Sequence, residues 1–168
     1  MWQRIGHCDD WRCGERFWHA GLSEDGAKCL IAEYDDNIYS VWDIQHGDVV
    51  WTDDGTDGNS PLAALQDWMD SNGVVEIEGG PAAGRYHIFG LEYNHPRTQS
   101  TILDQELRVS VEDAMLLVQR TSTGEKVSEL AFEAFSGDWA FASFSENDAT
   151  IAVLEPYNVT FFGRSCET

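Results

Sequence analysis

The sequence predicts a mainly β protein made of antiparallel β-meanders, arranged as a partial propeller-like array or a sandwich, with one short helix near residues 60–72. Three observations lead to this fold class. Short runs rich in β-branched and aromatic residues recur along the chain, and clusters of Gly, Asp, Asn and Ser separate them, as in strands joined by tight turns. Only one segment has apolar residues at helical spacing. The length of 168 residues suits a single domain, residues 1–168.

The clearest β unit lies in residues 22–51. It begins with a tight turn at residues 23–26, in which Gly26 can adopt a positive φ angle without steric cost. Asp35-Asp36 joins the next two strands, and His46-Gly47 closes a second hairpin. The predicted strands of this unit are residues 28–34, 37–43 and 48–51.

The predicted helix follows an acidic loop. Ser60 can cap its first turn, and Pro61 suits the first helical position because a proline there loses no hydrogen bond. Apolar residues then recur on one helical face, at Leu62, Leu65 and Met69. Asn72-Gly73 is a typical helix end.

The rest of the chain returns to β patterns. Further strands are predicted at residues 74–78, 85–93, 107–111, 114–120, 127–132, 139–144, 149–155 and 158–162. Residues 1–16 fit either a terminal strand or a loop packed over the core, and the sequence leaves that choice open.

The end of the chain repeats its beginning. Residues 18–43 align with residues 139–164, so that Ser23-Glu24 corresponds to Ser145-Glu146, with single-residue slips elsewhere. A weaker third copy begins at Ser110, and the spacing fits a unit of about 40 residues. The turn at residues 22–26, Val41-Trp42-Asp43 and Gly47 resemble the blades of WD-repeat β-propellers, although the Gly-His pair of that family is absent. The resemblance implies an open array of meanders whose loops face a protein partner.

Charge is distributed unevenly along the chain. The formal net charge is −20, from 30 acidic and 10 basic residues. Residues 29–84 contain twelve Asp and Glu and no Lys or Arg. A salt-adapted or merely soluble protein would spread its acids evenly, so this asymmetry favours a local acidic surface. Such a surface repels nucleic acid and anionic lipid and attracts basic proteins. The chain has no apolar run of about 18 residues and no secretory signal at its start, so a cytoplasmic protein without a membrane partner is expected.

No enzyme, cofactor or metal motif is present. The sequence lacks G-x-S-x-G, H-E-x-x-H, a Walker loop and G-x-G-x-x-G, so we expect no catalysis. Cys8 and Cys13 are spaced as C-x4-C without a second pair, which fits no structural zinc site, and they are expected to be free thiols with Cys29 and Cys166. The opposing hypothesis is a metal-dependent hydrolase that uses Asp35-Asp36 and Asp53-Asp54.

The predicted function is binding of a basic protein partner. The contact residues are predicted to be Asp35, Asp36, Asp43, Asp48, Trp51, Asp53, Asp54 and Asp57. A Trp surrounded by acids suits Arg and Lys side chains. Size, acidity and the lack of catalytic motifs resemble, by class only, bacterial immunity proteins that block the basic active site of a cognate toxin acting on nucleic acid. The alternatives are a DNA-mimic protein of the anti-restriction kind and a WD-repeat-like scaffold domain.

Overall fold

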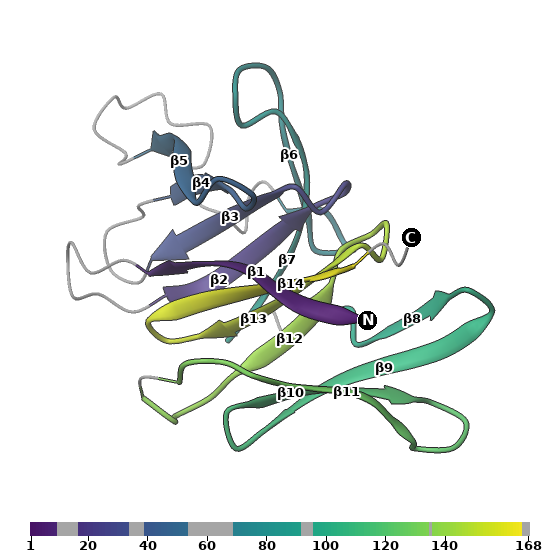
Figure 1. Cartoon of the computed structure of the whole chain (residues 1–168). Coiled ribbons are helices and arrows are strands. Elements are labelled where there is room, and N and C mark those ends of the chain that lie inside the picture. Colours follow the sequence, from purple (N-terminus) through teal and green to yellow (C-terminus); the bar gives the residue numbers. More distant parts are fainter. Residues whose placement is uncertain (10–16, 34–38, 54–68, 92–95, 135, 166–168) are drawn as a thin grey trace.

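The computed structural model describes residues 1–9, 17–33, 39–53, 69–91, 96–134 and 136–165, and its fourteen strands in these ranges form three antiparallel sheets (Figure 1). The central sheet has the order β1-β14-β13-β12, with β1 at Trp2–Asp9, β14 at Asn158–Arg164, β13 at Thr150–Glu155 and β12 at Phe141–Phe144. The outer sheet has the order β11-β10-β9-β8, with β11 at Lys126–Ala131, β10 at Met115–Arg120, β9 at Gln105–Glu112 and β8 at Gln99–Ile102. The curled sheet has the order β5-β4-β3-β2-β7-β6, with β5 at Asp48–Asp53, β4 at Tyr39–Asp43, β3 at Lys28–Glu33, β2 at Phe17–Ser23, β7 at Gly84–Gly90 and β6 at Val74–Ile77.

The central sheet is buried on both faces. Every residue of β13 is buried, and so is every residue of β14 except Arg164. Successive side chains of a strand point to opposite faces, so Ile151 and Val153 pack towards the outer sheet while Ala152 and Leu154 pack towards the curled sheet. This double burial explains why β13 is almost continuously apolar instead of alternating.

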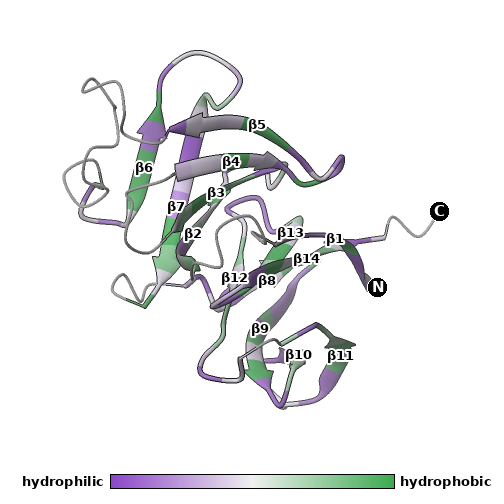
Figure 2. Cartoon of the chain, turned by 90° about the vertical axis from the view of Figure 1, so that its left-hand side faces the viewer, coloured by the Kyte–Doolittle hydropathy of each residue, from purple (hydrophilic) through white to green (hydrophobic). Residues whose placement is uncertain are grey.

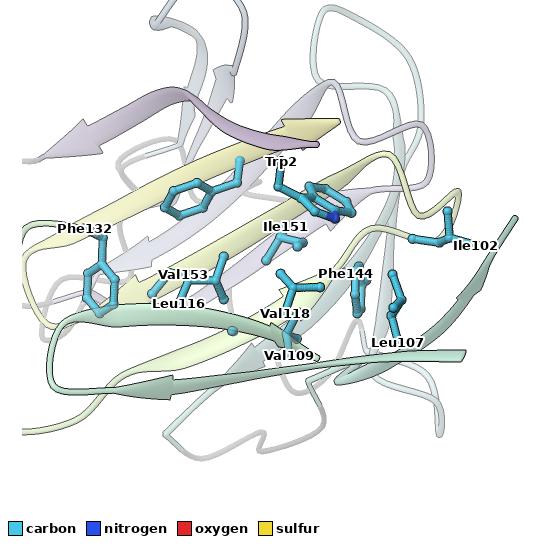
Figure 3. Close-up of a cluster of buried hydrophobic side chains, with 12 residues drawn as sticks. Trp2, Ile102, Leu107, Val109, Leu116, Val118, Phe132, Phe144, Ile151 and Val153 are labelled. Carbon is cyan, nitrogen blue, oxygen red and sulfur yellow. The ribbon is translucent and has the colours of Figure 1, made fainter. Parts of the chain in front are cut away.

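One apolar core lies between the central and outer sheets (Figure 3). Leu116 and Val118 of β10 meet Ile151 and Val153 of β13 there. At one end of this row, the rings of Trp2 and Phe144 lie 6.0 Å apart between centroids, tilted by 58°. The opposite face of the outer sheet is uncovered, so its strands alternate hydrophilic and hydrophobic residues, as β9 and β11 show in Figure 2.

The curled sheet closes around a third apolar cluster. Leu30 and Val41 of its inner strands, Val75 of β6 and Tyr86 of β7 are fully buried in this cluster, and Trp51 of β5 packs against it. Because β5 and β6 are the two edges of the sheet, their shared contact with one cluster means that the sheet curls.

Every strand predicted above overlaps an observed strand, so the mainly β, antiparallel fold class is confirmed. The strand β1, which the sequence left open, pairs with β14 over seven register positions and completes the central sheet. The outer and curled sheets each contain a four-stranded meander, whereas the central sheet contains a three-stranded meander, β12-β13-β14, to which the N-terminal strand β1 adds a fourth strand.

The predicted helix is not found in the described part of the chain. Residues 60–68 lie outside the described residues, and residues 69–72 form coil and turn. The Oδ1 atom of Asp70 accepts hydrogen bonds from the backbone N–H groups of Asn72 and Val74, at 2.8 and 3.0 Å. This side chain holds the backbone in a turn that leads directly into β6, which is why Asn72-Gly73 marks a turn and not a helix end. Among the described residues, no helix is long and apolar enough to cross a membrane.

The predicted repeat appears as two matching turns. One joins β2 to β3 at residues 23–28, and the other joins β12 to β13 at residues 145–150. In each, a serine hydroxyl donates to the carboxylate or amide oxygen two residues later, from Ser23 to Asp25 at 2.7 Å and from Ser145 to Asn147 at 2.8 Å. The two turns lie in contact, because the Nδ2 atom of Asn147 donates to the carbonyl oxygen of Asp25 at 2.8 Å.

Candidate partner-binding surface

The β4–β5 hairpin carries four of the eight predicted contact residues. Val41 of β4 is fully buried inside the curled sheet, whereas the next residue, Trp42, packs on the opposite face and donates from Nε1 to Ser40 Oγ at 2.9 Å. Val41 and Trp42 therefore lie on opposite faces of the sheet, as successive residues of a strand do. Trp51 faces Val41 across the hairpin and is half-buried against the inner cluster, so part of its ring is accessible.

Asp43 and Asp48 lie opposite each other at the turn end of this hairpin. Asp43 Oδ1 accepts the backbone N–H of His46 at 3.0 Å and lies 3.0 Å from His46 Nδ1. The hydrogen bond from the backbone N–H of His46 contributes most, and the one from its side chain comes second. Together they hold the pKa of Asp43 below its usual range, so its carboxylate is charged at neutral pH. Asp48 is exposed beside it.

Asp53 lies at the other end of the same strand. It pairs in register with Tyr39, five residues along β5 from Asp48. A strand rises about 3.3 Å per residue, so these two positions are separated by roughly 15 Å. The described acids therefore divide between two ends of the hairpin. Asp35, Asp36, Asp54 and Asp57 lie outside the described residues.

Both edge strands of the curled sheet come from the base-free stretch, residues 29–84. β5 forms one edge, and β6 forms the other with Glu76 exposed on it. Arg85, the first base after this stretch, pairs in register with Glu76 and also lies 3.9 Å from Glu146 in an exposed ion pair. The first base after the acidic stretch therefore lies on β7, directly beside the acidic edge strand β6.

The sequence reasoning missed a group of bases beside the matching turns. Lys28 donates from Nζ to the carbonyl oxygen of Pro81 at 2.9 Å. Arg97 donates to the carbonyl oxygen of Ser145, and its Nη2 lies 3.5 Å from Asp148. The internal repeat of the sequence could have indicated where these bases lie, because it aligns the two turns beside them.

Metal-ligand residues and cysteines were the remaining candidates for chemistry in the sequence. They contain no group of three or more His, Cys, Asp or Glu that could hold a metal ion. Cys8 and Cys29 are buried, and burial raises the pKa of the Cys29 thiol to about 12, which makes it inert at neutral pH. Cys13 and Cys166 lie outside the described residues, so the predicted count of four free thiols stays a prediction.

No known family description matches the chain, and no curated protein matches it.

Proposed function

We propose that this protein is an inhibitory binding protein for a basic protein partner, and most specifically an immunity protein that blocks the active-site cleft of a toxin acting on nucleic acid. One observation carries the proposal. Twelve acids and no base occupy residues 29–84, and both edges of the curled sheet belong to that stretch. The proposal excludes catalysis as the role of this surface.

The physical argument rests on electrostatic complementarity. A toxin that cleaves nucleic acid needs a basic cleft to hold phosphate, and an acidic surface free of bases is attracted to that cleft from a distance. Such steering raises association rates by about 10- to 1,000-fold at low salt. The half-buried Trp51, between Asp48 and Asp53, adds an aromatic surface on which a partner's Arg side chain can stack.

The test uses the product of the gene adjacent to this one as the candidate partner. We expect the triple variant Asp53→Asn, Asp54→Asn, Asp57→Asn to associate about tenfold more slowly at low salt and to show a weaker salt dependence. Its unfolding should be unchanged, since surface substitutions of this kind usually stay within about 0.5 kcal/mol.

The matched control neutralises three acids outside the base-free stretch. Two of them are already paired, Glu125 with Arg120 at 3.5 Å and Glu129 with Lys126 at 3.0 Å, and Glu133 is the third. We expect their replacement by Gln to leave association unchanged. Equal association of both triple variants, or an affinity that does not depend on salt, would contradict the proposal.

A second candidate is a scaffold domain of the WD-repeat kind. What favours it is that the outer and curled sheets each contain a four-stranded meander, and that β1 brings the three-stranded meander of the central sheet to four strands. A scaffold needs no charge complementarity, so it would bind its partner equally well at low and high salt. The salt series described above therefore separates the two candidates.

A further inference from the structure

A hollow of about 390 Å³ opens between Phe132, at one end of the core shared by the central and outer sheets, and Glu155, at the end of β13. The lining residues that matter here are Val111, Asp113, Phe132, Gly137, Trp139 and Glu155. This volume suits a small organic group, since ligand pockets commonly start near 300 Å³.

Two aromatic rings form its walls. Phe132 belongs to the buried core, and Figure 3 places it at the end of the row of core side chains. Trp139 is half-buried, and its ring lies 5.5 Å from that of Phe141 between centroids, tilted by 40°. The face of an aromatic ring carries a partial negative charge, which attracts cations.

One acidic side chain of the wall is buried. Glu155 lines the hollow with 1% exposure, and its Oε1 accepts the backbone N–H of Tyr157 at 3.1 Å. Asn158 lies opposite Glu155 across the β13–β14 hairpin but does not line the hollow.

A second acidic side chain lines the hollow. Asp113 lines the hollow from the β9–β10 turn and is exposed to solvent. No Lys, Arg or His is among the described lining residues. Two aromatic side chains and two acidic side chains therefore line one small volume.

We propose that this hollow binds the head group of an organic cation, an alkylammonium or alkylguanidinium. Such groups carry a positive charge and hydrogen-bond donors, which suit the acidic side chains of Asp113 and Glu155. Their alkyl stems suit the apolar wall that Val111 and Phe132 provide. The cation has two sources, a free amine or the Lys or Arg side chain of a protein. Only the second source rests on the proposed function, in which case the hollow anchors one side chain of the basic partner.

The first measurement is ligand-observed NMR with n-butylguanidinium, n-butylammonium and the uncharged isostere n-butylurea. We expect the two cations to bind in the millimolar range and the urea to bind at least tenfold more weakly. The capped peptide acetyl-Gly-Arg-Gly-amide distinguishes the sources. Its competition with n-butylguanidinium supports a protein side chain as the occupant, and binding of the small cations alone supports a free amine.

Three variants test the site itself. Trp139→Leu should weaken cation binding about two- to thirtyfold, the range of cation–π contributions from 0.5 to 2 kcal/mol. Glu155→Gln should weaken it further, with circular dichroism and thermal melting used to confirm that this buried substitution folds. Asp113→Asn should weaken it two- to threefold. Asp113 has a φ of 47°, and Asn tolerates the left-handed region as well as Asp does, so this variant keeps the test decisive if the others are unstable.

The matched control is Trp42→Leu, which removes a half-buried Trp from the opposite face of β4 and should leave cation binding unchanged. Equal binding of n-butylurea and n-butylguanidinium would overturn the proposal, and so would cation binding that none of the three hollow variants weakens. If the triple variant at Asp53, Asp54 and Asp57 associates with the partner as fast as the wild type, the proposed function is overturned. The proposed cation site is unaffected by that result.

Discussion

The turns at residues 23–28 and 145–150, here the first turn and the second turn, have the same hydrogen-bond pattern but different residues at three positions: Asp25 and Asn147, Gly26 and Asp148, and Lys28 and Thr150. In each, the backbone N–H of an alanine donates to the side-chain oxygen of Asp25 or Asn147 at 3.0 Å. In each, the serine hydroxyl also accepts the N–H five residues later, at 2.9 Å in the first turn and 3.0 Å in the second. Identical local geometry therefore does not explain why one turn carries Asp-Gly and the other Asn-Asp.

The difference follows from the contact between the turns. Three hydrogen bonds join the turns, and each runs from a donor of the second turn to a carbonyl oxygen of the first. Asn147 donates from its backbone N to Glu24 and from Nδ2 to Asp25, at 3.1 and 2.8 Å, and Thr150 Oγ1 donates to Gly26 at 2.9 Å. An amide is required at Asn147, because only an amide both accepts the serine hydroxyl and donates across the contact. The two turns thus share the hydrogen bonds within each turn. They differ in the contact that joins the curled sheet to the central sheet, where the first turn supplies acceptors and the second supplies donors.

The largest effect is expected for Gly26→Ala. Gly26 has a φ of 70°, and an added Cβ would lie 2.7 Å from Thr150 Oγ1 and 3.0 Å from Ser145 Oγ. Left-handed strain and overpacking together should cost about 2–5 kcal/mol of unfolding free energy, measured by urea titration.

The matched control is Asp148→Ala at the equivalent position. Asp148 already has a φ of 60° with a side chain in place, so this change removes mainly the ion pair with Arg97 and should cost about 1 kcal/mol. Equal losses for Gly26→Ala and Asp148→Ala would show that the two turns are interchangeable and that their contact imposes no asymmetry.

Asn147→Asp should cost about 1–3 kcal/mol at neutral pH. The change keeps the acceptor for Ser145 but places a carboxylate oxygen against the carbonyl oxygen of Asp25, which loses its donor. Repulsion should raise the pKa of the new carboxyl in the folded protein. Because its protonated form can donate to that carbonyl, the loss should shrink as the pH falls from 7 towards 4. A loss independent of pH in urea titrations at pH 4, 5.5 and 7 would contradict this mechanism.

A smaller effect is expected for Thr150→Val. The substitution preserves the shape of a side chain that is 4% exposed and removes the hydroxyl that donates to Gly26. The cost should be about 1 kcal/mol, the net contribution of one hydrogen bond. The control is Thr101→Val on the exposed face of β8, which should change unfolding by less than about 0.5 kcal/mol. Equal costs at both positions would mean that the bond between the turns contributes nothing.

These turns also show how much of the fold the sequence could predict. Ser-x-Asp and Ser-x-Asn, followed by a strand, mark both turns locally, and strand alternation marks most of the sheets. The pairing of β1 with β14 has no local signal, because it joins Trp2 to Arg164 across almost the whole chain. The helix prediction was wrong at residues 69–72 because the side-chain hydrogen bonds of Asp70 outweighed apolar spacing.

For the candidate surface, the sequence could predict which stretch is acidic but not where its acids lie in space. The absence of bases from residues 29–84 identifies the acidic stretch, but β5 carries Asp48 and Asp53 to opposite ends of a hairpin, which a count of charges cannot show. The hollow beside Trp139 depends on contacts between two sheets, so its residues, spread over positions 111 to 155, gave no joint signal.

The smallest change at neutral pH is expected for Asp25→Asn, which gives the first turn the same side chain as the second. Asn keeps the Oδ1 acceptor for Ser23 and Ala27, so unfolding at pH 7 should change by less than about 1 kcal/mol. The informative difference is at low pH. The hydrogen bond from Ser23, followed by that from Ala27 and the nearby charge of Lys28, lowers the pKa of Asp25 from 3.8.

A carboxyl whose pKa is lower in the folded state stabilises the protein above its unfolded pKa, and that contribution is lost as the pH falls through the folded value. The wild type should therefore lose more stability than Asp25→Asn below about pH 4. Burial lowers the pKa of His19 to about 4, so both proteins lose stability together between pH 6.5 and 4, and this term cancels in the difference. Urea titrations at pH 3, 5 and 7 measure that difference. If it stays constant across the three pH values, the carboxylate of Asp25 has no stabilising role of its own, and the first turn would work equally well with the amide that the second turn requires.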